Sequence, residues 1–152
     1  DMDTSGVLLI AKDPETHRQL QQLFETRHIK KRYIALLDGT VTDDEGIVRL
    51  PLCPNPDDRP RQMVSTAYGK AAVTRLGLVA QHGQTRVAFY PFTGRTHQLR
   101  VHAAHPEGLD TPIVGDNLYG RRASRLFLHA ETVTFRHFKT GRWVSITAPA
   151  PF

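Results

Sequence analysis

Two segments far apart in the chain carry side chains that could do chemistry. Residues 1–6 are Asp-Met-Asp-Thr-Ser-Gly, a short acidic segment with two carboxylates. Residues 94–102 are Gly-Arg-Thr-His-Gln-Leu-Arg-Val-His, a basic segment rich in hydrogen-bond donors. A carboxylate and an arginine attract one another when they lie close together. We therefore expect the two segments to form one composite site.

The acidic segment alone admits three interpretations. It could be a turn whose Asp and Ser side chains bond nearby backbone amides. It could belong to a magnesium-dependent, haloacid-dehalogenase-like phosphatase, with Asp1 as nucleophile, Asp3 as acid/base and Asp116 as a metal ligand. Thr4 lies one position early for that motif, and the second half of the chain is rich in strands. It could also supply a lone nucleophile, Asp1, that attacks an electrophilic carbon.

Charge is distributed unevenly along the 152 residues. Residues 1–50 carry 7 Lys and Arg against 9 Asp and Glu, whereas residues 51–152 carry 13 against 6, and 11 of those 13 are Arg. Such a basic region makes a polyanion the leading class of partner. The single cysteine, Cys53, excludes an internal disulfide and is typical of a reducing cytoplasm. No stretch approaches the roughly 20 apolar residues of a membrane span, so we expect no membrane partner. The cysteine content favours the cytoplasm, and a monomer is the default expectation.

The first half of the chain predicts a strand, a helix and a second strand. Residues 7–11 are a continuous apolar run, which indicates a strand covered on both faces. Asp13 before a proline predicts a helix start, and the apolar spacing extends the helix over 14–28. Residues 33–37 predict a second strand, which leaves residues 30–32 as a basic turn.

From Gly46 onward the pattern favours short strands. The prolines of 51–62 indicate a loop, and 96–104 predict a short helix with Thr96 as a possible cap. The expected strands are 47–50, 72–76, 85–89 and a closing hairpin of 133–135 and 143–146, turned at 139–141. These elements predict one mixed α+β domain over residues 1–152.

Taken in order, the motifs resemble those of RluA-type pseudouridine synthases, with a leaning toward the ribosomal large-subunit synthase A subgroup. Residues 1–6 are similar to that family's Asp-x-x-Thr-Ser-Gly, and residues 94–102 to its Gly-Arg-Thr/Ser-His-Gln-Ile/Leu-Arg-Val-His. Further matches are its Lys-x-Tyr at 31–33, Arg-Pro at 59–60, the segment 69–74, Pro-Ile-x-Gly-Asp-x-x-Tyr at 112–120 and Leu-His-Ala at 128–130. The family's His-Arg-Leu before the aspartate is absent, so we expect the domain to lack its N-terminal portion.

The resemblance implies a mixed, mostly antiparallel sheet with flanking helices and the conversion of specific uridines in rRNA and/or tRNA stem-loops to pseudouridine. That isomerisation is redox-neutral, so neither a cofactor nor a metal is expected. Asp1 would be the nucleophile and Arg100 would hold it, while Tyr33, the third catalytic residue, would stack on the uracil and help to move the C5 proton. Substrate-binding residues would be Arg95, Thr96, His97, Gln98, Lys31 and Leu128; Lys30, Arg32, Arg121, Arg122 and Arg125 are candidate phosphate contacts. A catalytically silent RNA-binding module stays open as the alternative.

Overall fold

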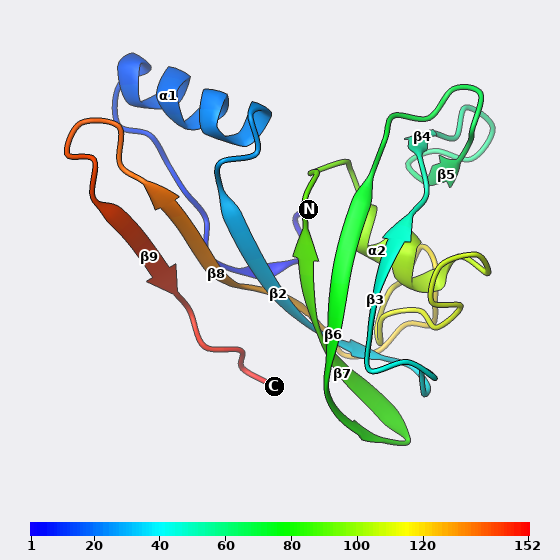
Figure 1. The fold of residues 1–152 in the computed structure, drawn as a ribbon. Helices are drawn as coiled ribbons and strands as arrows, with labels where there is room; N and C mark the ends of the chain where they lie inside the picture. The colour runs from blue at the N-terminus through cyan, green and yellow to red at the C-terminus, as the bar shows by residue number, and fades with distance from the viewer.

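A sheet of seven strands runs through the molecule and carries two helices (Figure 1). The computed structural model describes all of residues 1–152. The helices are α1 (Pro14–Glu25) and α2 (Gln98–Ala104). The strands are β1 (Ser5–Gly6), β2 (Lys30–Leu37), β3 (Glu45–Arg49), β4 (Leu52–Pro54), β5 (Gln62–Val64), β6 (Val73–His82), β7 (Gln84–Pro91), β8 (Leu128–Arg136) and β9 (Trp143–Thr147). Neither helix is long and apolar enough to span a membrane.

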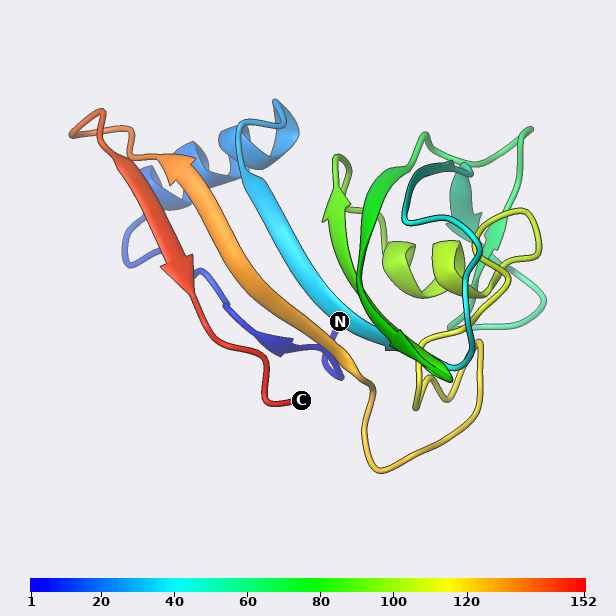
Figure 2. The same ribbon diagram turned by 60° about the horizontal axis from the view of Figure 1, so that its bottom comes forward.

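The strands of the large sheet follow the order β1-β8-β2-β7-β6-β3, while β4 and β5 form a separate pair. The outer edge of β8 is shared by two partners, which Figure 2 shows on the same side of that strand. β1 pairs in parallel with His129 and Ala130, and β9 pairs antiparallel with residues 132–136. All other strand pairs are antiparallel, so the predicted mixed, mostly antiparallel α+β fold is confirmed.

Helix α1 begins where the sequence predicts. Asp13 has extended backbone dihedrals, and its Oδ1 accepts the Thr16 N–H at 2.8 Å, which satisfies one of the free amides of the first turn. Leu20 and Leu23 pack against a small core formed with Val133 of β8. The helix ends at Glu25 rather than residue 28, because Arg27 adopts a left-handed φ of 60°.

Helix α2 lies on the other half of the sheet, where the main core is found. Leu99 and Ala103 belong to the largest apolar cluster, together with Val87 and Phe89 of β7. Packing of this face fixes the rotation of α2. All residues from Gln98 to Ala103 are buried, including the charged Arg100. The helix therefore brings a buried cation to the middle of the molecule.

Two expectations for the first half of the chain are wrong. Residues 7–11 are not a strand: only the Val7 amide reaches the sheet, donating to Ala130 O at 2.9 Å, and Leu8 and Ile10 are 79% and 77% exposed. Residues 30–32 are not a turn but the beginning of β2, which pairs with β8 from Lys30 onward. Cross-strand pairing outweighs the charge of this segment, because alternate side chains of a strand can point away from the core.

Two further expectations are corrected in the second half. The proline-rich segment 51–62 contains β4, which pairs with β5, and Pro54 stands at the end of that short ladder. A proline is tolerated there because little of the ladder follows it. Thr96 does not cap α2; the N-cap is His97, which has a left-handed φ of 55° and makes no capping hydrogen bond through its side chain.

Candidate active site

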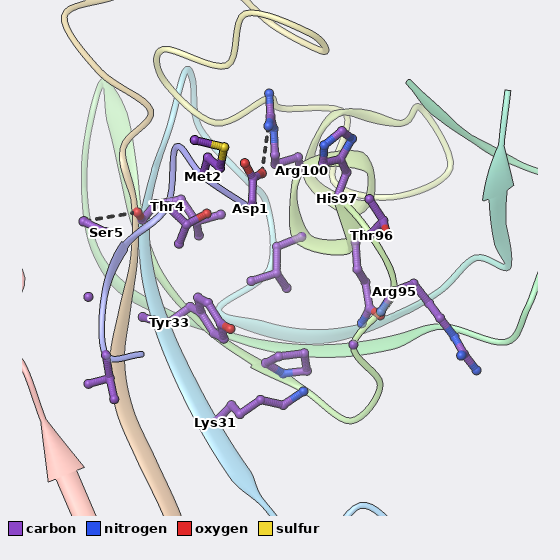
Figure 3. Close-up of a pocket in the computed structure, with 18 of the residues that line it drawn as sticks. Asp1, Met2, Thr4, Ser5, Lys31, Tyr33, Arg95, Thr96, His97 and Arg100 are labelled. Carbon is purple, nitrogen blue, oxygen red and sulfur yellow. Dashed lines mark hydrogen bonds and ion pairs between the residues drawn. The ribbon is translucent and has the colours of Figure 1, made fainter. Parts of the chain in front are cut away.

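A cavity of about 850 Å³ lies where β1, β2, β8 and the segment leading into α2 meet (Figure 3). Asp1 and Arg100 lie at one end, and Tyr33 and Lys31 project from β2 at the other. All nine residues predicted for the site line this cavity: Asp1, Lys31, Tyr33, Arg95, Thr96, His97, Gln98, Arg100 and Leu128. The fold thus brings together residues from opposite ends of the chain, from Asp1 to Leu128.

Arg100 is held between two carboxylates, one on each side of its guanidinium. Asp116 accepts from Nε at 3.0 Å and from Nη2 at 2.6 Å, so this contact is bidentate. Asp1 accepts from Nη1 at 2.8 Å. The Arg100 and Asp116 side chains are 2% and 0% exposed, whereas Asp1 is 18% exposed toward the cavity. The buried pair is therefore the fixed part, and Asp1 is the carboxylate that it orients at the cavity.

Asp1 is held from its C-terminal side by the attachment of β1 to β8. Gly6 has a φ of +112°, and a Cβ at this position would lie 2.1 Å from the Ala130 carbonyl oxygen. Only glycine permits so close a backbone approach. Ser5 Oγ lies 2.8 Å from His129 Nδ1, and the opposite ring nitrogen of His129 donates to Ala148 O at 2.7 Å. The Ala148 oxygen can only accept, so Nε2 is the donor there, and the strand is fixed by side chains as well as backbone.

Tyr33 and Lys31 present a ring and an amine to the cavity from alternate positions of β2. Burial raises the pKa of Tyr33 above its usual value, so its phenol remains protonated at neutral pH. Burial lowers the pKa of Lys31, whose Nζ lies 3.4 Å from the Thr93 carbonyl oxygen. A protonated, half-buried ring is suited to stacking on a planar base.

His97 and Tyr119 lie beside Arg100. His97 Nδ1 is 2.8 Å from the Tyr119 hydroxyl, and the two rings meet edge to face at 5.6 Å. Burial, and then the positive charge of Arg100, lower the pKa of His97, so its imidazole is neutral at neutral pH. The Tyr119 ring lies 5.5 Å from the Arg100 guanidinium and covers it.

Three of the predicted substrate-binding residues, Gln98, Thr96 and Arg95, differ in burial and in the hydrogen bonds that they already make. The Gln98 amide is buried and occupied: Oε1 accepts from Thr93 Oγ1 and the Arg95 N–H, and Nε2 donates to Val73 O and Thr74 Oγ1. It braces the segment before α2 and has no free polar atom for a ligand. Thr96 is exposed, and Arg95 points away from Asp1, with Nε donating to Ala71 O (Figure 3).

Comparison with known proteins agrees with this geometry. The profile of the family described as RNA pseudouridylate synthase matches residues 1–105. The chain belongs to this family. It is 41% identical to a dual-specificity RNA pseudouridine synthase RluA of Pasteurella multocida, covering 100% of this chain and 71% of that protein. The corresponding protein of Escherichia coli K12 is 40% identical over the same shares, so the chain is an RluA-type RNA pseudouridine synthase, an isomerase of RNA uridine.

Solved structures of relatives have the same fold as this synthase. A human protein, RNA pseudouridylate synthase domain containing 1, superposes with a TM-score of 0.86 at 28% identity, over 100% of this chain and 67% of that one. A second human protein, domain containing 4, gives a TM-score of 0.74 at 23% identity over 91% and 64%, which shows the fold alone.

Two residues that hold Arg100 in the synthase site, Asp116 and Asn117, are not among the site residues predicted from the sequence. Asp116 was considered only as a metal ligand in the phosphatase interpretation, and the family assignment overturns that interpretation. Asp116 instead anchors Arg100, and its Oδ1 also accepts the N–H groups of Leu118 and Tyr119. Asn117 Oδ1 accepts from Arg100 Nη2 at 3.3 Å. The signal was their common place in the motif at 112–120, next to Tyr119.

Proposed function

We propose that this synthase isomerises uridines in rRNA and/or tRNA stem-loops with Asp1 as its nucleophile. The observation that carries the proposal is the pairing of Asp1 with a buried arginine that Asp116 already neutralises. The remaining carboxylate oxygen of Asp1 accepts only the Asp3 amide, at 3.2 Å. The group is thus oriented at the cavity by Arg100 and stays accessible from it.

The reaction that this group would serve breaks the N1–C1′ bond, turns the uracil and joins C5 to C1′. The C5 proton then leaves to solvent and the released N1 takes up a proton, so the product has the composition of the substrate. Asp1 could act on C1′ or on C6, or assist glycal formation, and a covalent step would divide the barrier in either of the first two routes. Tyr33 would hold the detached ring by stacking, since its aromatic ring lines the cavity.

A uridine in a stacked or paired RNA has to be flipped out before it can enter the cavity, at a cost of a few kcal/mol. Contacts to the phosphates offset this cost. Arg95 lies at the rim with its terminal nitrogens directed outward, and Lys31 lies inside. The relatives named dual-specificity synthases support more than one RNA substrate for this chain.

The experiment is tritium release from rRNA and tRNA transcripts labelled at uracil C5. We expect release by the protein and none by Asp1→Asn. The matched control is Asp3→Asn, which should keep the rate of the wild type because the Asp3 side chain makes no hydrogen bond to Arg100. Undiminished release by Asp1→Asn would exclude the nucleophile. Salt-sensitive RNA binding without any release would favour the silent RNA-binding module. A monomer in the cytoplasm is part of the same proposal, measurable by light scattering and by cell fractionation.

A further inference from the structure

The Tyr119 hydroxyl lies between a backbone amide and an imidazole. The Gln62 N–H donates to this hydroxyl oxygen at 2.8 Å, and His97 Nδ1 lies 2.8 Å from it on another side. A phenol has one hydrogen to donate. Within the protein the phenol can use this hydrogen only in the contact with Nδ1, because no other acceptor contacts the hydroxyl. Nδ1 is then an acceptor, and the proton of the neutral ring is on Nε2.

The His97 ring is fixed in the same way by its surroundings. Its backbone has a left-handed φ of 55° at the N-cap of α2, which sets the direction of the side chain. The Tyr119 ring packs edge to face against it, with an angle of 74° between the planes. His97 lines the cavity with Asp1 and Arg100, and no protein acceptor contacts its Nε2–H (Figure 3).

Tyr119 is itself held by the buried ion pair. Its backbone N–H donates to Asp116 Oδ1 at 3.1 Å, and its ring lies 5.5 Å from the guanidinium of Arg100. Tyr119 therefore contacts both Arg100, which orients Asp1, and the His97 imidazole. A displacement of Tyr119 would move both groups.

We propose that Tyr119 is a positioning residue, which presents the Nε2–H of His97 to a carbonyl oxygen of the flipped uracil. The proposal rests on the function proposed above. The pKa of His97, lowered by burial and by Arg100, agrees with an uncharged donor. An uncharged donor suits the uncharged base, whereas Lys31 and Arg95 are the cations that this cavity offers to phosphates.

The first test is nitrogen NMR of the protein labelled with ¹⁵N-histidine, without RNA, at pH 7.5. The signals of His97 are identified by their loss in His97→Gln. We expect an unprotonated Nδ1 and a protonated Nε2, and a changed Nδ1 shift in Tyr119→Phe but not in the control Tyr68→Phe, because Tyr68 is 83% exposed. A proton on Nδ1, or shifts that Tyr119→Phe leaves unchanged, would overturn the proposal.

The second test is the single-turnover rate on a stem-loop transcript that releases tritium. His97→Phe removes the donor, and we expect a rate about tenfold lower, the cost of one lost hydrogen bond to a desolvated partner. His97→Gln, which can donate from a similar position, should recover most of that loss. Tyr119→Phe should lower the maximal rate with little change in the RNA concentration at half saturation. Equal rates for His97→Gln and His97→Phe would contradict the proposed donor.

Substrate analogues locate the acceptor. Sulfur is a weaker acceptor than oxygen, so replacing the contacted uracil oxygen, in 2-thiouridine or 4-thiouridine, should slow the wild-type protein. The same analogue should not slow His97→Phe further, because that variant has already lost the donor. If a methylphosphonate beside the target abolishes the effect of His97→Phe instead, the acceptor is a phosphate and the proposal is wrong. Absence of tritium release from every RNA would contradict the proposed function, and the nitrogen shifts with and without uridine monophosphate would then still decide whether Nε2–H meets the base.

Discussion

Replacing Asp116 with alanine should destabilise the synthase far more than replacing Asp1, although both changes remove a carboxylate from Arg100. This change removes the carboxylate that accepts from both Nε and Nη2 of Arg100, leaving Nη2 only the neutral Asn117, in a place where the Arg100 and Asp116 side chains are 2% exposed or less. An uncompensated charge left in such a site typically costs about 3–5 kcal/mol of unfolding free energy. Asp1 remains 2.8 Å from Nη1 and compensates part of the charge, so we expect a loss of about 3 kcal/mol, at the lower end of this range.

Asp1→Asn should leave the stability nearly unchanged while abolishing the activity. The Asn side chain can still accept from Nη1, and Arg100 retains both bonds to Asp116, so we expect a loss of about 1 kcal/mol or less. Activity should disappear all the same. The control is Asp38→Ala, which removes an ion pair whose Arg121 side chain is 82% exposed, and it should change stability by about 0.5 kcal/mol or less.

Urea denaturation followed by circular dichroism measures all three variants. For a chain of this size, a loss of 3 kcal/mol corresponds to a melting temperature lower by roughly 6–12 °C. Asp116→Ala should also lose activity below its melting temperature, because Arg100 then no longer holds Asp1 in place. The reasoning fails if Asp116→Ala is as stable as Asp38→Ala, or if Asp1→Asn unfolds as readily as Asp116→Ala.

Three further outcomes follow from single positions. Gly6→Ala should lower both stability and activity, since its Cβ would lie 2.1 Å from Ala130 O; thermal melting and tritium release check this. His102 accepts from Thr74 only while neutral, and burial lowers its pKa below the ordinary 6.5. The unfolded chain therefore binds the extra proton, so stability is complete above pH 6.5 and falls below it, and urea titrations of His102→Asn should show a shallower decline toward pH 5. Tyr33→Phe should keep its affinity for RNA in filter binding, because the stacking ring remains, whereas Tyr33→Ala should lose affinity.

That the nine expected residues lie together could be predicted from the sequence, whereas the contacts of each could not. All nine expected residues line the cavity, because each belongs to a motif whose order and spacing are visible in the chain. Their roles depend on partners that no spacing reveals. Gln98 belongs to the basic segment, yet its amide is used within the protein by Thr93 and Thr74. Asp116 was noticed as an acid, but its partner Arg100 is 16 positions away and meets it only through the packing of α2.

Local signals were reliable where the structure is determined locally. The Asp13 cap of α1 and the hairpin of β8 and β9 lie as expected, since each needs only residues close in sequence. Predictions were wrong where pairing with a distant strand of the sheet determines the local structure. Residues 7–11 have the composition of a buried strand, but only Val7 bonds to β8. Lys30, conversely, lies in a strand despite its charge, because β8 pairs with it from across the sheet.

The placement of Asp1 follows from two anchors that lie on opposite sides of the cavity. On one side β1 has only two residues, and its hold on β8 depends on the glycine approach and on the Ser5–His129 contact. On the other side, the fully buried carboxylate of Asp116 fixes Arg100 independently of its contact with Asp1. A two-residue strand stores little binding energy, so the buried pair is the stronger anchor. The position of the proposed nucleophile is therefore set mainly by the helix and loop from the opposite half of the chain, and substitutions there should affect chemistry as strongly as substitutions beside Asp1 itself.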